Sequence, residues 1–238
     1  IIAFENKNNS DALNFFNSSK ILLDQHDPYL ERYISSLILE KKISQAINIL
    51  KKYKDKSSSK FFEAYLLLIV DNLKKKDFDQ AQSNLLLAID LAKQDRFNLA
   101  IVESLKQYIF VFKEKKFLNN KKNFGNLSII SETFQRCYLG DAKTEKYFLN
   151  LINSSEADYA RYIYFYLSFL IENGRKDDAK KITDNLTFVN TTLLLSQGKS
   201  WIENENAEKL NDFFSCKNHN DIISEFLFLI SNLYSSQD

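Results

Sequence analysis

The sequence predicts an all-α fold in which antiparallel helical hairpins stack into a right-handed α-α superhelix, or solenoid. Apolar residues recur at intervals of three and four along most of the chain, which is the period of an amphipathic helix and not of a strand. The 238 residues include only 4 Gly and 1 Pro, too few for the many tight turns of a β-sandwich or barrel. Because 45% of the residues are hydrophobic, the chain can bury a sizeable core.

Two hairpins can be traced in order along the first part of the chain. An Asp-Pro pair at 27–28 is typical of a helix start, and polar residues at 40–42 separate this first helix from a second one over 43–53. The same arrangement returns with an apolar helix over 61–74 and a second helix that begins after Asp77, an expected N-cap. Each pair of helices is therefore predicted to form a hairpin with a short polar turn.

Alanines at a regular spacing mark the expected second helices of the hairpins. Each alanine is followed four residues later by a large apolar residue, and the alanines are separated by 34 and 35 residues. The pairs are Ala12 with Phe16, Ala46 with Leu50, and Ala81 with Leu85. Self-similarity at this spacing is typical of stacked units that share one continuous core.

This pattern resembles the tetratricopeptide repeat (TPR), in which bulky and small residues alternate with fixed spacing on two helices. The matching positions of the first helices are Leu30, Tyr33, Ile34 and Leu37, then Tyr65, Leu68, Ile69 and Asn72. A weaker copy places Gly174 in a turn and Ala179 in a second helix, whereas the closing proline of the motif is absent. The amino-terminal hairpins also resemble an uncharacterised family of bacterial TPR proteins. The resemblance implies a non-catalytic scaffold or adaptor that binds proteins or peptides.

We expect one helical solenoid over residues 1–238, whose parts differ in regularity. Regular repeats are expected over 1–95, irregular hairpins over 96–153, and degenerate repeats with closing helices over 154–238. The first hairpin lacks most of its first helix, and the segment 221–236 is apolar on nearly all sides, which a terminal helix in water would avoid. We therefore expect the chain to be a fragment of a longer protein.

The charge of the chain bears on which partners are expected. The 32 basic and 31 acidic residues give a net charge of +1, which makes nucleic acid or an anionic membrane unlikely as the main partner. The longest apolar run, 162–171, is too short to span a bilayer. A long helix is expected over 97–116, followed by a loop. The basic stretch 113–122, which covers the end of this helix and the start of the loop and includes Phe117, is the best nucleic-acid candidate. A solvated helix end is the preferred interpretation of this stretch. An RNA-binding helical repeat remains the alternative function, as does a region that braces or regulates an activity outside this fragment.

The residue types needed for catalysis or metal binding are scarce, so we expect no enzymatic activity, no cofactor and no metal site. His26 is expected in a solvated turn, and His219 follows Cys216 without the companion residues of a thiol enzyme. Cys137 and Cys216 are expected to be free buried thiols, with a single disulfide as the less favoured alternative. For the location of the protein, the cytoplasm is favoured over the periplasm. Two acidic pairs are expected to cap helices: Asp141 with Glu145, and Asp177 with Asp178.

A protein or peptide partner is expected on the inner face of the superhelix, which is made by the first helices. The chaperone-tail clamp of Lys, Asn and Arg found in some TPR proteins is missing, and the inner positions are unusually apolar. This face therefore either binds an apolar segment of a partner or is covered by later helices of the chain. The candidate partner-binding residues are Glu31, Ser35, Leu66, Val70, Arg161 and Tyr164, the last two being expected to project towards the inner side.

Overall fold

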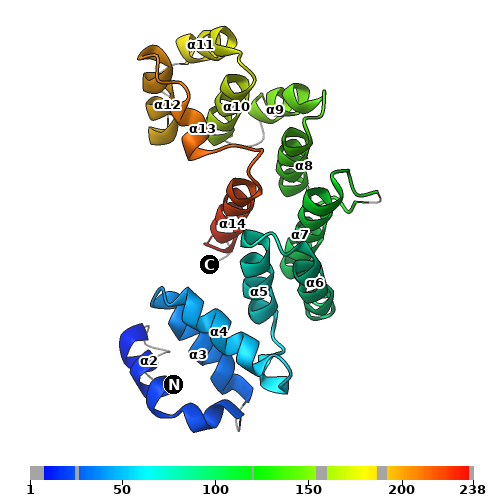
Figure 1. The fold of residues 1–238 in the computed structure, drawn as a ribbon, viewed down its shortest axis with the longest axis vertical. Helices are drawn as coiled ribbons and strands as arrows, with labels where there is room; N and C mark the ends of the chain where they lie inside the picture. The colour runs from blue at the N-terminus through cyan, green and yellow to red at the C-terminus, as the bar shows by residue number, and fades with distance from the viewer. Residues whose placement is uncertain (1–7, 25–26, 120, 154–159, 187–191, 236–238) are drawn as a thin grey trace. The chain divides into compact units, whose positions relative to one another are not determined.

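The computed structural model describes residues 8–24, 27–119, 121–153, 160–186 and 192–235. Within these ranges the chain forms α-helices and two short 3-10 helices and contains no strand, as predicted (Figure 1). It divides into two compact units, Ile1–Ile109 and Phe110–Asp238, and the division falls within one helix. No helix of the described ranges combines the length and the apolar character that crossing a bilayer requires.

In its described residues, unit 1 has a first helix followed by two consecutive helical hairpins. Its helices are α2 (Asn9–Ser18), α3 (Asp27–Leu39), α4 (Ile43–Tyr53), α5 (Phe62–Lys74) and α6 (Phe78–Ala92), with the 3-10 helices η1 (Lys20–Asp24) and η2 (Ser57–Ser59) between them. The helix α7 (Arg96–Glu114) follows and contains the boundary to unit 2. The expected helix starts and polar turns of this part are thus confirmed to within one residue, and the Asp77 carboxylate accepts a hydrogen bond from the Gln80 N–H at 3.1 Å.

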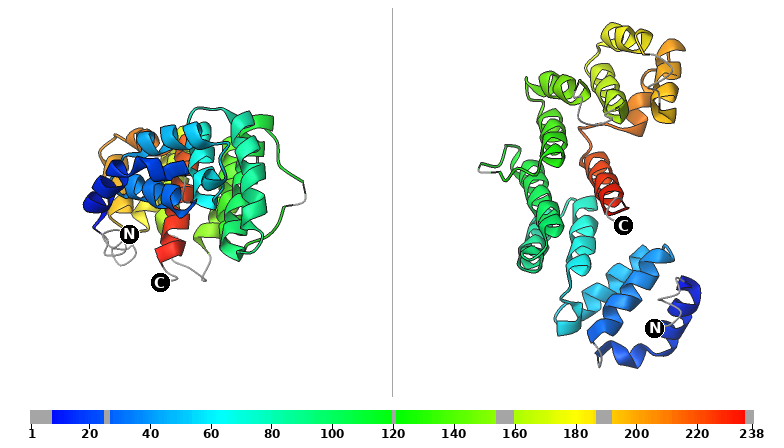
Figure 2. Two further views of the ribbon diagram at one scale, coloured as in Figure 1. Left: turned by 90° about the horizontal axis from the view of Figure 1, so that it is seen from below. Right: turned by 180° about the vertical axis from the view of Figure 1, so that it is seen from behind.

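Unit 2 contains three hairpins and a final long helix. Its helices are α8 (Asn126–Leu139), α9 (Thr144–Ile152), α10 (Ala160–Glu172), α11 (Lys176–Asp184), α12 (Leu193–Glu203), α13 (Lys209–Phe213) and α14 (His219–Ser235). The helix α10 is central, because α9, α11, α12 and α13 all pack against it (Figure 2, right). The sequence predicted α10, α11 and α14 but did not single out α8, α12 or α13.

One turn geometry recurs in the five hairpins of the described residues. In the first, the Lys41 N–H donates to the Ile38 carbonyl at 2.9 Å, and the Lys42 N–H donates to the Leu37 carbonyl at 2.8 Å. Lys41 has a φ of 59°, so this is a Schellman turn with its central residue in the left-handed region. The same pair of bonds around a residue with positive φ is repeated at Lys76, Gly140, Gly174 and Glu205. The shared turn is what makes each helix pair antiparallel.

Close helix approach in unit 1 depends on the alanines that the sequence singled out. Ala46 and Ala81 have no exposed surface, and Ala12 is 2% exposed. The large residue four positions later is also buried in each case. The first helices bury the positions expected from the repeat pattern, including Leu30, Tyr33 and Ile69. The side chains of α2 to α4 and the start of α5 thereby form one hydrophobic core.

Aromatic side chains dominate the core of unit 2. Four ring centroids, from α9, α10 and the linker after α13, lie 5.5 to 6.3 Å from that of Phe134 on α8: those of Phe148, Tyr162, Phe165 and Phe214. The rings of Phe165 and Phe214 approach to 4.2 Å. Because Phe214 lies in the linker between α13 and α14, this linker is fixed to the core of the unit.

Candidate interaction surface

Four of the predicted partner-binding residues lie at the surface of unit 1, on the first helices of its two hairpins. On α3, Glu31 is exposed and Ser35 is half-buried, its hydroxyl donating to the Glu31 carbonyl at 3.0 Å. On α5, Leu66 and Val70 are half-buried and lie one turn apart. Leu73, which the sequence also placed on this face, is fully buried. The accessible apolar part of α5 is therefore the pair Leu66 and Val70.

Beside this pair, the nearly buried carboxylate of Asp71 holds two lysines. Its oxygens lie 2.7 Å from the Lys51 Nζ of α4 and 2.7 Å from the Lys75 Nζ at the end of α5. The side chain of Asp71 is 8% exposed, whereas those of Lys51 and Lys75 are 45% and 58% exposed. Burial alone would raise the pKa of Asp71, but the hydrogen bonds from both lysines hold it below its ordinary value. The two ammonium groups are thus fixed side by side at the surface.

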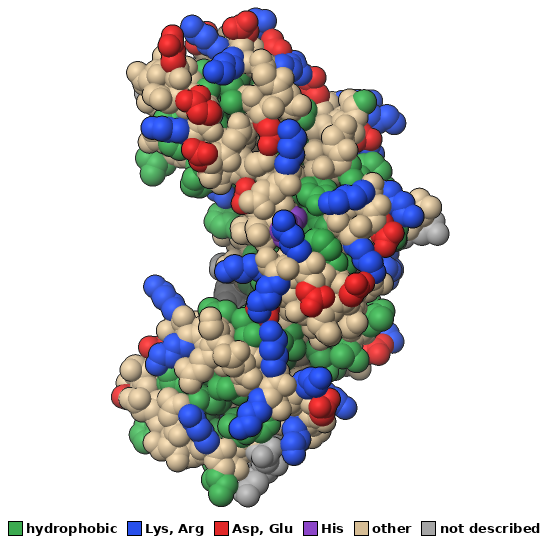
Figure 3. All heavy atoms as spheres, viewed as in Figure 1, with side chains coloured by type: hydrophobic (Ala, Val, Ile, Leu, Met, Phe, Trp, Pro, Cys, Tyr) green, Lys and Arg blue, Asp and Glu red, His purple; other side chains and the backbone are tan. Residues whose placement is uncertain are grey.

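Unit 1 also carries an excess of exposed lysine that the net charge of the whole chain conceals. Residues 41–76 contain ten lysines and only three acidic residues, a local charge of +7 in a chain of net charge +1. All ten are exposed: Lys41, Lys42, Lys51, Lys52, Lys54, Lys56, Lys60, Lys74, Lys75 and Lys76. Figure 3 shows blue side chains spread over this part of the molecule with few red ones among them. We call residues 41–76 the lysine-rich surface.

Arg161, the fifth predicted residue, is half-buried and engaged within unit 2. Its guanidinium donates to both carboxylate oxygens of Glu225 on α14 at 2.7 to 3.1 Å, and it lies 4.2 Å from the centroid of the Phe228 ring. Glu225 is 3% exposed. Burial raises the pKa of Glu225 above its ordinary value, and Arg161 only partly opposes this effect. The pair fastens α14 to α10.

Tyr164 is a core residue, which corrects the expectation that its ring projects from the inner side. It has no exposed surface, and its hydroxyl donates to the Leu210 carbonyl of α13 at 3.4 Å. Gly198 of α12 lies against the ring, since a Cβ added there would stand 3.0 Å from a ring carbon. The later helices α12 and α13 therefore cover this position, which was the second of the two alternatives for the inner face.

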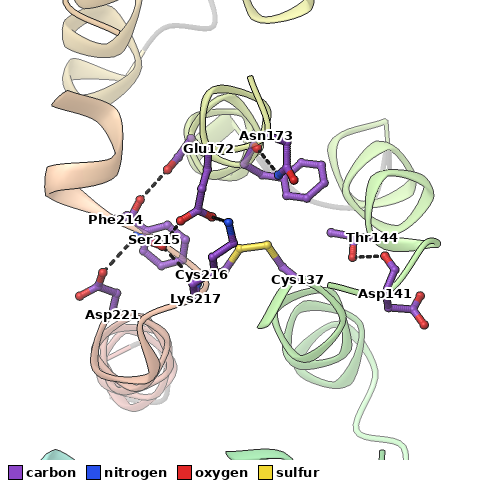
Figure 4. Close-up of a disulfide and its surroundings, with 12 residues drawn as sticks. Cys137, Asp141, Thr144, Glu172, Asn173, Phe214, Ser215, Cys216, Lys217 and Asp221 are labelled. Atoms are coloured by element: carbon purple, nitrogen blue, oxygen red, sulfur yellow. Dashed lines mark hydrogen bonds and ion pairs between the residues drawn. A yellow bond between two sulfur atoms is a disulfide. The ribbon is translucent and has the colours of Figure 1, made fainter. Parts of the chain in front are cut away.

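The two cysteines form a disulfide, so the expectation of free thiols was wrong. Cys137 of α8 and Cys216 of the α13–α14 linker have Cα atoms 5.7 Å apart, within the usual range for a disulfide. The neighbouring Ser215 hydroxyl donates to the Glu172 carboxylate at 2.6 Å, which holds the linker against α10, and accepts from the Lys217 N–H at 3.2 Å (Figure 4). A bonded Cys216 has no thiol to act as a nucleophile with His219, whose buried ring packs against Phe112 at a centroid distance of 5.7 Å. His26 lies outside the described residues.

The expected acidic caps have additional roles. Asp141 accepts from the Lys143 N–H at 2.9 Å, as a cap would, and also pairs with Arg136 at 2.9 Å. Glu145 instead joins two hairpins by pairing with Arg175 at 2.8 Å, and Asp178 pairs with the same guanidinium at 2.7 Å. The hydrogen bond from Arg175 lowers the pKa of Glu145. These carboxylates stabilise the packing of α9, α10 and α11 against one another.

Three described residues of the basic stretch 113–122 contact α8 or one another. Lys115 contacts the ring and hydroxyl of Tyr138, and Phe117 lies between Lys121 and Arg136, each 4.9 Å from its ring centroid. Burial lowers the pKa of Lys121. The aromatic ring that could have stacked on a base is thus occupied by the chain's own cations.

The sequence missed Asp71 with its two lysines and Glu225 with Arg161. Asp71 had a signal, being an acid inside the strongly apolar helix 61–74 and followed by three lysines. Glu225 had none, because its partner is 64 residues away. Among the described residues no group of three or more His, Cys, Asp or Glu is placed to hold a metal ion. Comparison of the chain with protein-family models, with curated proteins and with solved structures gave no match.

Proposed function

We propose that this protein is a TPR-like helical repeat protein, arranged as a right-handed superhelix, that acts as a non-catalytic scaffold for a protein or peptide partner. The observation that carries the proposal is the recurrence of one Schellman turn in five hairpins, together with the buried alanines of the repeat pattern. Stacked hairpins of this kind present long, shallow faces, and their usual use is recognition of another chain. The surface of α5 around Leu66 and Val70 is the proposed contact face.

The proposal is tested with a random peptide display library and a matched pair of double variants. Leu66→Glu with Val70→Glu places two charges on the proposed contact face. Leu86→Glu with Leu87→Glu places the same charges on exposed leucines of α6, which are 61% and 52% exposed. We expect peptides selected on the wild type to bind the first variant at least about tenfold more weakly and the control variant unchanged. Equal binding to all three proteins would refute the proposed face.

We infer that the protein works in an oxidising compartment, in place of the cytoplasm favoured from the sequence. The support is the buried Cys137–Cys216 disulfide, because such bonds persist where thiols are not kept reduced. Rapid acid quenching of the source cells, followed by thiol labelling under denaturing conditions, should leave both cysteines unlabelled. Complete labelling of both would contradict this location.

A further inference from the structure

We propose that the lysine-rich surface of unit 1 binds an acidic segment of the partner protein, with Lys51 and Lys75 as the central contacts and Leu66 and Val70 as the adjoining apolar contacts. This inference rests on the proposed scaffold function and names the chemistry of the partner.

The first support is the segregation of charge. Residues 1–40 contain three basic and six acidic residues, and residues 77–109 contain three basic and five acidic residues. The lysine-rich surface between them has a charge of +7. A dispersed set of surface lysines would be balanced locally by acids, and neither of the two flanking stretches has an excess of lysine. A field of one sign attracts and orients a partner of the opposite sign.

The second support is that Asp71 fixes two of the ammonium groups. Each lysine side chain is ordinarily mobile and loses rotamer freedom when it binds an anion. Here both Nζ atoms are held within 2.7 to 2.8 Å of one carboxylate that is itself 8% exposed. One carboxylate neutralises only one of the two charges, and each ammonium has three N–H donors. The pair therefore offers a net positive charge with spare donors in a fixed place, which lowers the entropic cost of binding.

The third support concerns which kind of anion fits. Leu66, Val70 and Lys74 follow one another at intervals of four and form one stripe on α5, with Asp71 at its edge towards α4. Apolar and cationic contacts thus adjoin, as an amphipathic acidic peptide requires. Single-stranded RNA would need stacking platforms, but the four aromatic side chains of residues 41–76 are buried or half-buried. Arginine, the residue that stacks on bases and pairs with phosphates in bidentate fashion, is absent from the same residues. A protein segment is therefore the better match.

The experiment uses peptides selected from the random library on the full chain. One selected peptide is synthesised as found and with Gln in place of every Asp and Glu, and a single-stranded oligouridine serves as a third probe. Binding is measured by fluorescence anisotropy at low and high salt. We expect the selected peptides to be enriched in acidic residues, and the Gln version to bind about tenfold more weakly at low salt.

Two variants locate the effect. Lys51→Gln with Lys75→Gln should weaken binding of the acidic peptide about tenfold, whereas Lys180→Gln with Lys209→Gln, which removes the same charge from exposed lysines of unit 2, should not. Asp71→Asn makes the surface more positive but releases the two ammonium groups. If net charge alone determined affinity, this variant would bind the acidic peptide more tightly. Because we propose that Asp71 positions the two ammonium groups, we expect weaker binding.

Several results would overturn the inference. These are equal binding of the acidic and Gln peptides, unchanged binding by the Lys51 and Lys75 variant, or tighter binding of oligouridine than of any selected peptide. Binding that depends on Leu66 and Val70 but on no lysine would overturn the inference and leave the scaffold function intact. Binding that depends on the lysines alone would support the acidic partner, and would contradict the apolar contacts in both the inference and the proposed function.

Discussion

At single positions, side-chain volume decides how closely two helices of this protein approach. Ala46 and Ala81 lie without exposed surface where the helices of a hairpin cross, and Gly198 plays the same part where α12 crosses the Tyr164 ring. The alanines were predictable because their spacing repeats along the chain. Tyr164 was assigned to the wrong environment because its burial depends on α12 and α13, whose residues lie 34 to 46 positions away and leave no local pattern.

We expect Gly198→Ala to destabilise the protein although alanine favours helix. The added Cβ would stand 3.0 Å from Tyr164 and 3.2 Å from Leu210, closer than ordinary packing allows. Overpacking of this kind costs about 1 to 3 kcal/mol and outweighs the gain of about 1 kcal/mol in helix propensity. Urea unfolding measures the difference, and Ser196→Ala at an exposed site of the same helix is the control. A stabilised Gly198→Ala protein would show that α12 does not press on the ring.

Ala46→Leu should likewise lower the free energy of unfolding by about 1 to 3 kcal/mol. Ala46 has no exposed surface and lies on α4, which packs against α3, so a larger side chain would have to displace its neighbours. Ala142→Leu, at an exposed position before α9, should change stability by no more than about 0.5 kcal/mol. Equal thermal shifts for the two variants would mean that the repeat register is wrong.

At the level of elements, local signals predicted the helices that carry them, and long-range contacts fixed the rest. The expected helices around Asp77, Asp141 and Gly174 exist because caps and turns are encoded within a few residues. The five-residue α13 lacks a side-chain cap and could not be predicted. It is held by Asn211, whose amide donates to the Ser168 carbonyl of α10 at 2.9 Å. The docking of α14 depends in the same way on a distant partner, Arg161.

The Arg161–Glu225 pair should give α14 a characteristic pH dependence. Because burial raises the pKa of Glu225, protonation stabilises the folded state, and this contribution is lost as pH rises from about 4 through the raised pKa. Glu225→Gln should therefore gain stability relative to the wild type between about pH 4 and pH 7. Arg161→Ala leaves a buried carboxylate without its cation and should cost about 3 to 5 kcal/mol at pH 7, and less at pH 4. Urea midpoints at both pH values give the comparison, and parallel pH profiles for all three proteins would contradict it.

At the level of the whole molecule, the distribution of charge and the covalent cross-link matter more than any single helix. The net charge of +1 argued against nucleic acid or an anionic membrane as the main partner, but it is the sum of a strongly basic hairpin region and a mildly acidic remainder. The position of the lysines could be read from the sequence, whereas their arrangement around Asp71 needed the packing of α4 on α5. From the sequence the disulfide was only the less favoured alternative, because two cysteines 79 residues apart carry no information about their distance in space.

Removal of the disulfide should destabilise unit 2 by about 2 to 5 kcal/mol, because the unfolded chain regains the freedom that a large closed loop denies it. The measurement is urea unfolding of the wild type with and without dithiothreitol. Cys137→Ala with Cys216→Ala should match the reduced wild type and be insensitive to the reductant. An unchanged urea midpoint after complete reduction would contradict this expectation.

The same cross-link has a mechanical consequence. Tension applied to the two ends of the chain passes through the sulfur atoms and bypasses the 79-residue span that holds α9 to α13. That span corresponds to roughly 270 Å of extended chain, at about 3.4 Å per residue. When the oxidised protein is pulled by its ends, only the residues outside this loop would unfold. The hairpins around α10 would bear no force while unit 1 is extended. Reduction of the disulfide would allow this span to extend under the same force.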